Sequence, residues 1–158
     1  MKVCFVYPTT PDRTMMANYP PLGILYLSAT LKKAGHEVFV FDRYRSFCQN
    51  EDLSQVDSLL AKYLNEFKPD YVGITATTLL IPDAYHTAHI VRLVHPDSKI
   101  IVGGCHPTAL PEQTLEECPE IDIVCRGEGE QTLIELLEAG SPKGIGGLTF
   151  KNLDGSIT

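Results

Sequence analysis

The sequence predicts an α/β fold in which an open, doubly wound sheet of five parallel strands carries helices on both faces. Short β-branched runs alternate with longer amphipathic stretches through the first 140 residues. The short runs are nearly all apolar, as strands buried on both faces must be. With 158 residues, of which 44% are hydrophobic and 21% charged, the chain has the size and composition of one soluble domain with a single core.

The strands and helices follow one another in a regular order. Five strands are expected at Lys2–Tyr7, Glu37–Asp42, Tyr71–Thr75, Lys99–Val102 and Asp122–Cys125. The stretches between them predict helices that end at a glycine or just before a proline, at Pro21–Ala34, Leu53–Phe67, Ile81–Val94, Pro111–Glu117 and Glu130–Glu138. Five such units favour the flavodoxin-like strand order 2-1-3-4-5, with a Rossmann-like order as the alternative.

The pattern changes after Gly140. Gly147–Lys151 and Ser156–Thr158 flank the turn sequence Asn-Leu-Asp-Gly, which predicts a C-terminal β-hairpin. We therefore divide the chain into an α/β domain at 1–140 and a hairpin or linker at 141–158. Because the sequence stops at this hairpin, we expect a further domain to follow it, with a chain that naturally ends there as the alternative.

Charge and composition exclude several classes of partner. The net charge is −7, and no basic cluster is longer than Arg43-Tyr44-Arg45, so nucleic acid is not an expected partner. No apolar run reaches the roughly 18–20 residues of a membrane span, and no signal peptide is recognisable, so we expect a cytoplasmic protein. The five cysteines are odd in number and widely spaced, which predicts reduced thiols rather than disulfides or a zinc site.

The candidate binding residues lie in the loops that leave the strands, since doubly wound sheets bind ligands beyond the carboxyl ends of their strands. We call these loops the strand exits. Four of the five exits contain glycines, small or hydroxyl side chains, or a proline at the start of the next helix. The candidates are Thr9, Pro21, Leu22, Gly23, Thr75, Ala76, Thr77, Thr78, Gly103, Gly104, His106, Pro107, Thr108, Arg126, Gly127, Glu128 and Gly129. Taken singly, Pro21 could equally be a helix N1 proline, and the threonines could be strand or helix-start residues.

Nucleotide-binding fingerprints are missing from these exits. The first exit has no GxGxxG, and no GxxxxGK[ST] occurs anywhere in the sequence. No residue is assigned a catalytic role.

Five segments follow one another along the sequence: PPLGILYLSATLKKAGHEVFVFD, PDYVGITATT, KIIVGGCHPTALPEQTL, DIVCRGEGEQTLIELL and GGLTFKNLDGSI. Taken together in this order, they resemble the cobalamin-binding domain of cobalamin-dependent radical S-adenosylmethionine (SAM) proteins. The resemblance implies a corrin lying across the carboxyl edge of a flavodoxin-like sheet, with the nucleotide tail beside the strands.

The resemblance also implies a role for each exit. Pro21 to Gly23 would border the corrin, and Thr75, Thr77 and Thr78 would line the tail cleft or meet corrin amides. The tail would pass close to the backbone of Gly103 and Gly104, and Arg126 to Gly129 would close the far side.

Two family motifs are absent. The DxHxxG motif should follow the first strand, where this sequence has Pro-Thr-Thr-Pro-Asp-Arg. The resemblance therefore implies base-off cobalamin with no histidine ligand from that loop.

The CxxxCxxC motif is also missing, so the iron–sulfur cluster and SAM would belong to a radical domain outside this sequence. That domain would be the partner, and the parent protein would be a radical SAM methyltransferase or a related enzyme, with this chain not catalytic alone.

His106 is the histidine best placed to approach cobalt, but we interpret it first as a residue that hydrogen-bonds its loop. His86 and His89 are interpreted as surface or partly buried helix residues, and Cys105 as a small buried thiol. No metal ligand is assigned. Two alternatives remain open, namely a flavodoxin-like domain that binds flavin or a nucleotide sugar, and a cobalamin-responsive regulator.

Overall fold

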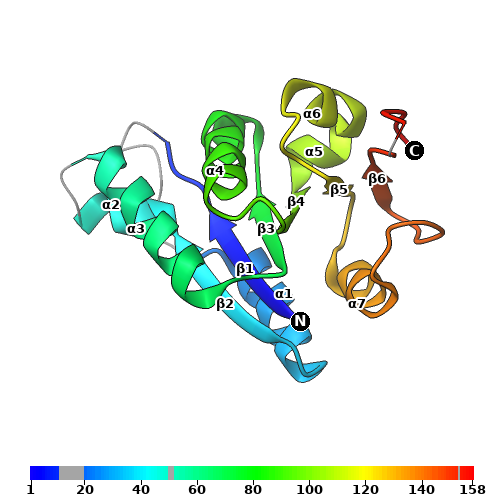
Figure 1. Cartoon of the computed structure of the whole chain (residues 1–158), viewed down its shortest axis with the longest axis horizontal. Helices are drawn as coiled ribbons and strands as arrows, with labels where there is room; N and C mark the ends of the chain where they lie inside the picture. Colours follow the sequence, from blue (N-terminus) through cyan, green and yellow to red (C-terminus); the bar gives the residue numbers. More distant parts are fainter. Residues whose placement is uncertain (11–19, 50–51, 153) are drawn as a thin grey trace.

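The computed structural model describes residues 1–10, 20–49, 52–152 and 154–158, which form one six-stranded sheet between two layers of helices (Figure 1). The strand order is β2-β1-β3-β4-β5-β6, so the flavodoxin-like order predicted for the first five strands is confirmed. Most of the long loop expected between the first strand and the first helix falls on residues 11–19, which lie outside the described residues.

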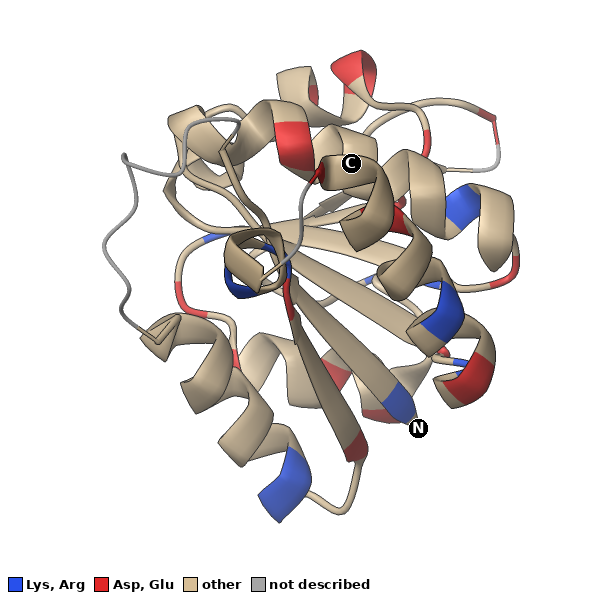
Figure 2. Ribbon diagram, turned by 90° about the vertical axis from the view of Figure 1, so that its left-hand side faces the viewer, with Lys and Arg blue, Asp and Glu red and all other residues tan. Residues whose placement is uncertain are grey.

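Five strands are parallel, and the sixth is antiparallel to its neighbour. Their bounds are β1 (Lys2–Tyr7), β2 (Glu37–Asp42), β3 (Tyr71–Thr75), β4 (Lys99–Gly103), β5 (Ile123–Cys125) and β6 (Leu148–Phe150). Charged residues occur only at the ends of these strands, and elsewhere they lie on helices and loops (Figure 2). An uncharged strand centre is what burial on both faces requires.

The helices predicted from periodicity are confirmed to within one or two residues. The described helices are α1 (Leu22–Lys33), α2 (Arg43–Gln49), α3 (Leu53–Phe67), η1 (Thr78–Leu80), α4 (Ile81–Val94), α5 (Cys105–Ala109), α6 (Pro111–Glu117) and α7 (Glu130–Ala139). Three short ones were not predicted. Helix α2 follows β2 directly, where the Asp42 carboxylate accepts the Arg45 backbone N–H at 2.8 Å. Helix α5 and the single turn η1 lie inside loops whose glycine and threonine content suggested irregular structure.

Each face of the sheet has its own core. On one face α3 and α4 pack on alternate strand residues such as Val6, Val72 and Val102. On the other face α1 and α7 lie side by side over Val3 and Phe5 of β1 and the neighbouring strands. Among the described residues, no helix has both the length and the apolar character needed to cross a membrane.

The C-terminal hairpin is present, but its first strand belongs to the main sheet. Lys151 bridges Ile157, and the Asn152 N–H donates to the Ser156 carbonyl at 2.8 Å, while Leu153 lies outside the described residues. Strand β6 pairs with β5 from Cys125–Leu148 to Ile123–Phe150. The expected five-stranded sheet is thus six-stranded, because the buried segment Leu148–Phe150 covers the open edge of β5.

A fully buried arginine fixes the start of α2. The Arg43 side chain is 0% exposed, with Nε 2.8 Å and Nη2 2.9 Å from the two carboxylate oxygens of Asp83. Its Nη1 lies 2.8 Å from Asp57 Oδ1. Burial would lower the pKa of Arg43, but the bonds to Asp83 and Asp57 outweigh it and raise that pKa. Asp83 also accepts the Thr9 backbone N–H at 2.8 Å, so one ion cluster joins the β1 exit to α2, α3 and α4.

We predict that Arg43→Ala lowers the free energy of unfolding by about 3–5 kcal/mol, because it removes the buried cation that both Asp83 and Asp57 contact. Urea denaturation measures this change. Arg45→Ala is the matched control, since Arg45 is exposed on the same helix and its loss should change stability by less than about 0.5 kcal/mol. Equal effects of the two substitutions would contradict the assigned role of the ion cluster.

Candidate functional site

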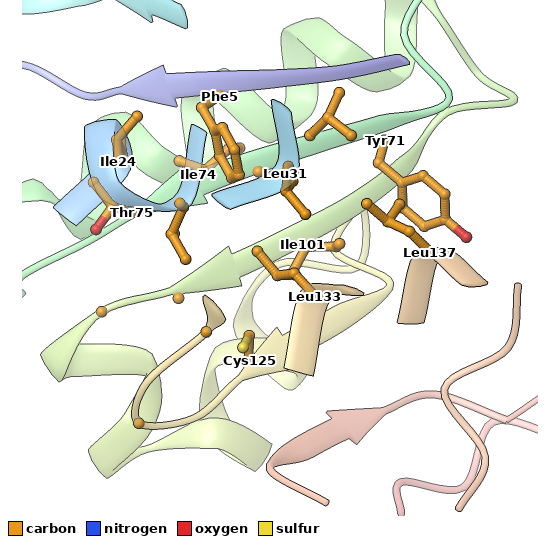
Figure 3. A pocket seen from close by; sticks show the side chains of 17 residues that line it. Phe5, Ile24, Leu31, Tyr71, Ile74, Thr75, Ile101, Cys125, Leu133 and Leu137 are labelled. Carbon is orange, nitrogen blue, oxygen red and sulfur yellow. The ribbon is translucent and has the colours of Figure 1, made fainter. Parts of the chain in front are cut away.

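An apolar cleft lies between the sheet and the pair of helices α1 and α7 (Figure 3). It contains about 590 Å³ of space free of protein atoms, counting the part open to solvent. Apart from Ile74, the strand residues that line it come from alternate positions of four strands, and the others come from the two helices and the β4 and β5 exits. The lining residues are Val3, Phe5, Ile24, Leu27, Leu31, Tyr71, Gly73, Ile74, Thr75, Ile101, Gly103, Gly104, Cys125, Gly127, Gly129, Leu133 and Leu137.

Strand register explains why the cleft opens at the carboxyl edge. The row nearest that edge pairs Thr75 with Gly103 and Gly103 with Cys125, so its side chains are small or absent. One row further in, Phe5 pairs with Gly73 and Gly73 with Ile101. Side-chain volume therefore increases toward the amino ends of the strands. The cleft is therefore closed toward the amino ends of the strands and open at their carboxyl ends, which is where doubly wound sheets bind ligands.

The aromatic ring of Phe5 forms the floor of the cleft. A Cβ atom at Gly73 would lie 2.6 Å from the Cδ1 and Cε1 atoms of Phe5, so the ring occupies the place of a missing side chain. Any larger residue at position 73 would displace the ring, which makes this glycine a requirement of close packing.

Tyr71 closes the far end of the cleft. The Tyr71 side chain is 7% exposed, and its hydroxyl points away from Phe5 and Ile101 (Figure 3). Burial raises the pKa of Tyr71, and the charges of Asp70 and Asp122 raise it further. The phenol therefore stays neutral in the physiological range.

The glycine at position 104 serves the protein's own backbone. Gly104 has φ +104°, and a Cβ there would lie 2.6 Å from the Ala76 carbonyl oxygen. The Ala76 N–H donates to the Gly103 carbonyl at 2.8 Å, and the His106 N–H donates to the Ala76 carbonyl at 3.3 Å. The sequence resemblance implies a ligand tail that passes close to the Gly104 backbone. In the structure, the backbone of Ala76 at the β3 exit lies close to Gly104. A side chain there would disturb both loops before any ligand arrived.

The predicted site residues divide into three groups. Five line the cleft, namely Thr75, Gly103, Gly104, Gly127 and Gly129. Three are buried beneath the carboxyl edge, namely Thr9, Ala76 and Pro107. The others lie at that edge outside the cleft and are exposed or half-buried: Pro21, Leu22, Gly23, Thr77, Thr78, His106, Thr108, Arg126 and Glu128.

Hydrogen bonds connect the exits that these residues occupy. His106 Nδ1 and Thr78 Oγ1 lie 3.1 Å apart and share a hydrogen bond between the fourth and third exits. The Gly127 N–H donates to Thr108 Oγ1 at 3.0 Å, which joins the fifth exit to the fourth. The three neighbouring exits therefore form one connected surface.

Two other histidines, His86 and His89, contact carboxylates away from this surface. His86 pairs with Asp57 at 2.7 Å, and His89 pairs with Glu120 at 3.1 Å. Nowhere in the described ranges do three or more His, Cys, Asp or Glu side chains gather as a metal site would require.

All five cysteines are free thiols, as expected, but Cys105 is exposed rather than buried. It begins α5 at the surface, directly after the turn at Gly104. Cys125, by contrast, lies in the cleft, where burial and the charge of Glu130 raise its pKa to about 11. Its thiol is protonated at neutral pH and adds to the apolar lining.

Sequence reasoning missed most of the apolar residues of the cleft, including Phe5, Leu27 and Leu133. The available signal was the period of two within each strand, which places Phe5, Gly73 and Ile101 on the same face. The helical residues carried only the ordinary signal of a core-facing side chain, which does not distinguish a packed core from a cleft wall.

Comparison with known proteins identifies relatives. A family model described as the B12 binding domain matches residues 13–137. An uncharacterized methyltransferase of Pyrococcus horikoshii is 41% identical over 96% of this chain and 33% of its own length. The anaerobic magnesium-protoporphyrin IX monomethyl ester cyclase of Cereibacter sphaeroides is 35% identical over 88% of this chain and 22% of its own length. The cytidylyl-2-hydroxyethylphosphonate methyltransferase of Streptomyces wedmorensis is 29% identical over 87% of this chain and 28% of its own length.

The chain thus spans a third or less of the length of these curated relatives. The family match extends from the β1 exit to the end of the cleft wall on α7 and covers most of the chain. Because that match covers most of the chain and agrees with the flavodoxin-like strand order and with a cleft at the carboxyl edge, the protein belongs to the B12-binding domain family.

Proposed function

We propose that the chain holds cobalamin with its corrin across the carboxyl edge of the sheet and its nucleotide tail in the cleft under α1 and α7. The observation that carries this proposal is the cleft itself. It is apolar, opens at the edge where ligands of this fold bind, and has side chains that are small or absent along the row nearest the opening.

The residues present fit both parts of cobalamin. A benzimidazole base is flat and apolar, and it matches a cleft walled by Phe5, Ile101 and Leu133. The corrin carries neutral amide arms, which suit the hydroxyls of Thr77 and Thr78 and the backbone groups of the glycine exits. Leu22 is 63% exposed at the start of α1 and offers an apolar contact for the ring.

A lower base that lies in the cleft cannot also coordinate cobalt, so we propose that cobalamin binds in the base-off form. The β1 exit offers no histidine to replace the base, since the sequence there is Pro-Thr-Thr-Pro-Asp-Arg. His106 shares its Nδ1 with Thr78, which supports its role in bonding the loop. No protein imidazole is therefore assigned to cobalt.

The role of the chain in a larger protein is also part of the proposal. Bound cobalamin supplies methyl transfer or radical chemistry, and the chain's own residues bind and orient it. We place the iron–sulfur cluster and SAM in a further domain of a radical SAM methyltransferase or a related enzyme. Support comes from relatives that are about three or more times longer and that are named methyltransferases and a cyclase.

Five free cysteines fit the reducing cytoplasm that we propose as the location of the protein. Family membership argues against flavin or nucleotide sugar as the ligand.

We predict that titration with hydroxocobalamin, followed by desalting, leaves the protein with a corrin absorption spectrum of base-off form. The physical reason is that the base cannot occupy the cleft and the cobalt at once. Electron paramagnetic resonance of the Co(II) form should then show no splitting from a nitrogen ligand.

A retained base-on spectrum would contradict the placement of the tail in the cleft. Nitrogen splitting that disappears in His106→Ala would contradict the absence of a histidine ligand. A protein that emerges colourless would contradict the binding function of the isolated chain.

We predict that Leu27→Phe weakens cobalamin binding at least tenfold. Leu27 lines the cleft, with its Cδ2 atom 3.3 Å from where a Cβ at Gly129 would lie, so a larger ring there intrudes on the tail. Dissociation constants from spectral titration measure the effect. Leu93→Phe is the matched control, because Leu93 is 71% exposed on α4 across the sheet.

Cobinamide, which lacks the nucleotide tail, separates the two parts of the site. Its affinity should be nearly the same for wild type and Leu27→Phe. An equal loss for cobalamin and cobinamide would show that the substitution acts on the corrin surface or on the fold, and the tail would then lie elsewhere.

A further inference from the structure

The walls of the cleft are almost free of polar groups along its middle. Among the described lining residues, the polar side-chain groups are the hydroxyls of Thr75 and Tyr71 and the thiol of Cys125. Thr75 lies in the row at the mouth, and the Tyr71 hydroxyl points away from the cleft (Figure 3). A neutral thiol is only a weak donor and acceptor. None of the three offers a strong partner to a ligand held at mid-depth.

Backbone groups do not supply the missing partners. Along the middle rows, β1, β3 and β4 are hydrogen-bonded to one another in continuous parallel register, for example through Phe5, Gly73 and Ile101. Backbone groups outside the ladders occur at the exits, which lie at the mouth of the cleft and not at mid-depth, and two of them, the Gly103 carbonyl and the Gly127 N–H, have partners in the protein. The interior therefore resembles an apolar solvent more than a hydrogen-bonding site.

The shape of the interior favours a flat ring. The Phe5 ring forms the floor over Gly73, and the walls are aliphatic side chains from α1 and α7, namely Ile24, Leu27, Leu31, Leu133 and Leu137. An aromatic base can stack on the floor and meet hydrocarbon on both sides. A polar edge on that base would lose its water and find no replacement.

From these observations we propose that the cleft selects among cobamides by the polarity of the lower base, accepting dimethylbenzimidazole and disfavouring adenine. The inference rests on the proposed function and adds a specificity to it. Adenine is of similar size, but its exocyclic amino group and additional ring nitrogens must be desolvated on entry. Phe5, Ile101 and Leu133 are the residues assigned to this discrimination.

The test compares three corrinoids on the same 158-residue chain: cobalamin, the cobamide that carries adenine as its lower base, and cobinamide. Spectral titration gives a dissociation constant for each. We expect cobalamin to bind about ten- to a hundredfold more tightly than the adenine cobamide, as expected when an apolar pocket meets an added polar group. Cobinamide should bind less tightly than cobalamin, because it leaves the cleft empty.

The outcomes separate this inference from the proposed function. Equal affinity for cobalamin and the adenine cobamide would overturn the inference and leave the function standing. Failure of all three corrinoids to bind would overturn the function and the inference together.

A variant tests whether the lining causes the preference. Leu133→Gln places an amide donor and acceptor in the wall, so the ratio between the two cobamides should fall several-fold. Leu93→Gln makes the same exchange at an exposed position on the opposite side of the sheet and should leave the ratio unchanged.

A folded Leu133→Gln protein with the wild-type ratio would show that the wall does not set the preference. Thermal unfolding establishes whether the variant is folded. If it is not, the comparison of the three corrinoids on the wild-type chain decides the question alone.

Discussion

The packing of one sheet face determines the rest of this structure. A sheet covered by helices on both sides must fill two interfaces, and the face under α3 and α4 is filled by valines and other β-branched residues from alternate strand positions. The face under α1 and α7 is filled only toward the amino ends of the strands. Near the carboxyl edge the row of Thr75, Gly103 and Cys125 leaves space that no described side chain occupies. Empty apolar space destabilises a fold, and this cost supports the proposal that the hollow receives a ligand.

A second constraint holds the edge of that hollow in place. The β1 exit is attached through the Thr9 N–H to Asp83, which also binds the buried Arg43. The third and fourth exits are joined by the backbone of Ala76, and the fourth and fifth by Thr108. The described parts of the carboxyl edge are therefore organised by hydrogen bonds within the protein. Such a surface can receive a large, rigid ring with little rearrangement.

Much of the fold could be predicted from the sequence because its signals were local. Each long helix had a periodic apolar stripe and an end marked by glycine or proline, and each strand was an apolar run. The missed elements lacked such signals. Helix α2 begins without a loop after β2, and α5 and η1 are single turns stabilised by their contacts. Strand β6 was expected as part of the hairpin, and only its place in the main sheet was missed, because that place depends on the free edge of β5 in the assembled fold.

The site was only partly predictable for the same reason. The glycines and threonines of the exits stood out by composition, whereas Phe5, Leu27 and Leu133 look like any core residues in the sequence. What distinguishes them is the open space beside them, and that space arises from residues that are distant in sequence but paired in the sheet, such as Thr75, Gly103 and Cys125. The exposure of Cys105 was likewise unpredictable, because it follows from the turn that Gly104 allows.

The thiol of Cys125 has a chemical consequence for whatever occupies the cleft. Only the thiolate form of cysteine is a good nucleophile and reductant. With a pKa of about 11, roughly one Cys125 side chain in ten thousand is ionised at pH 7. A sulfur atom thus lines the cleft without being a reactive thiolate, so a nucleotide tail placed there, as we propose, would meet a wall that does not react with it.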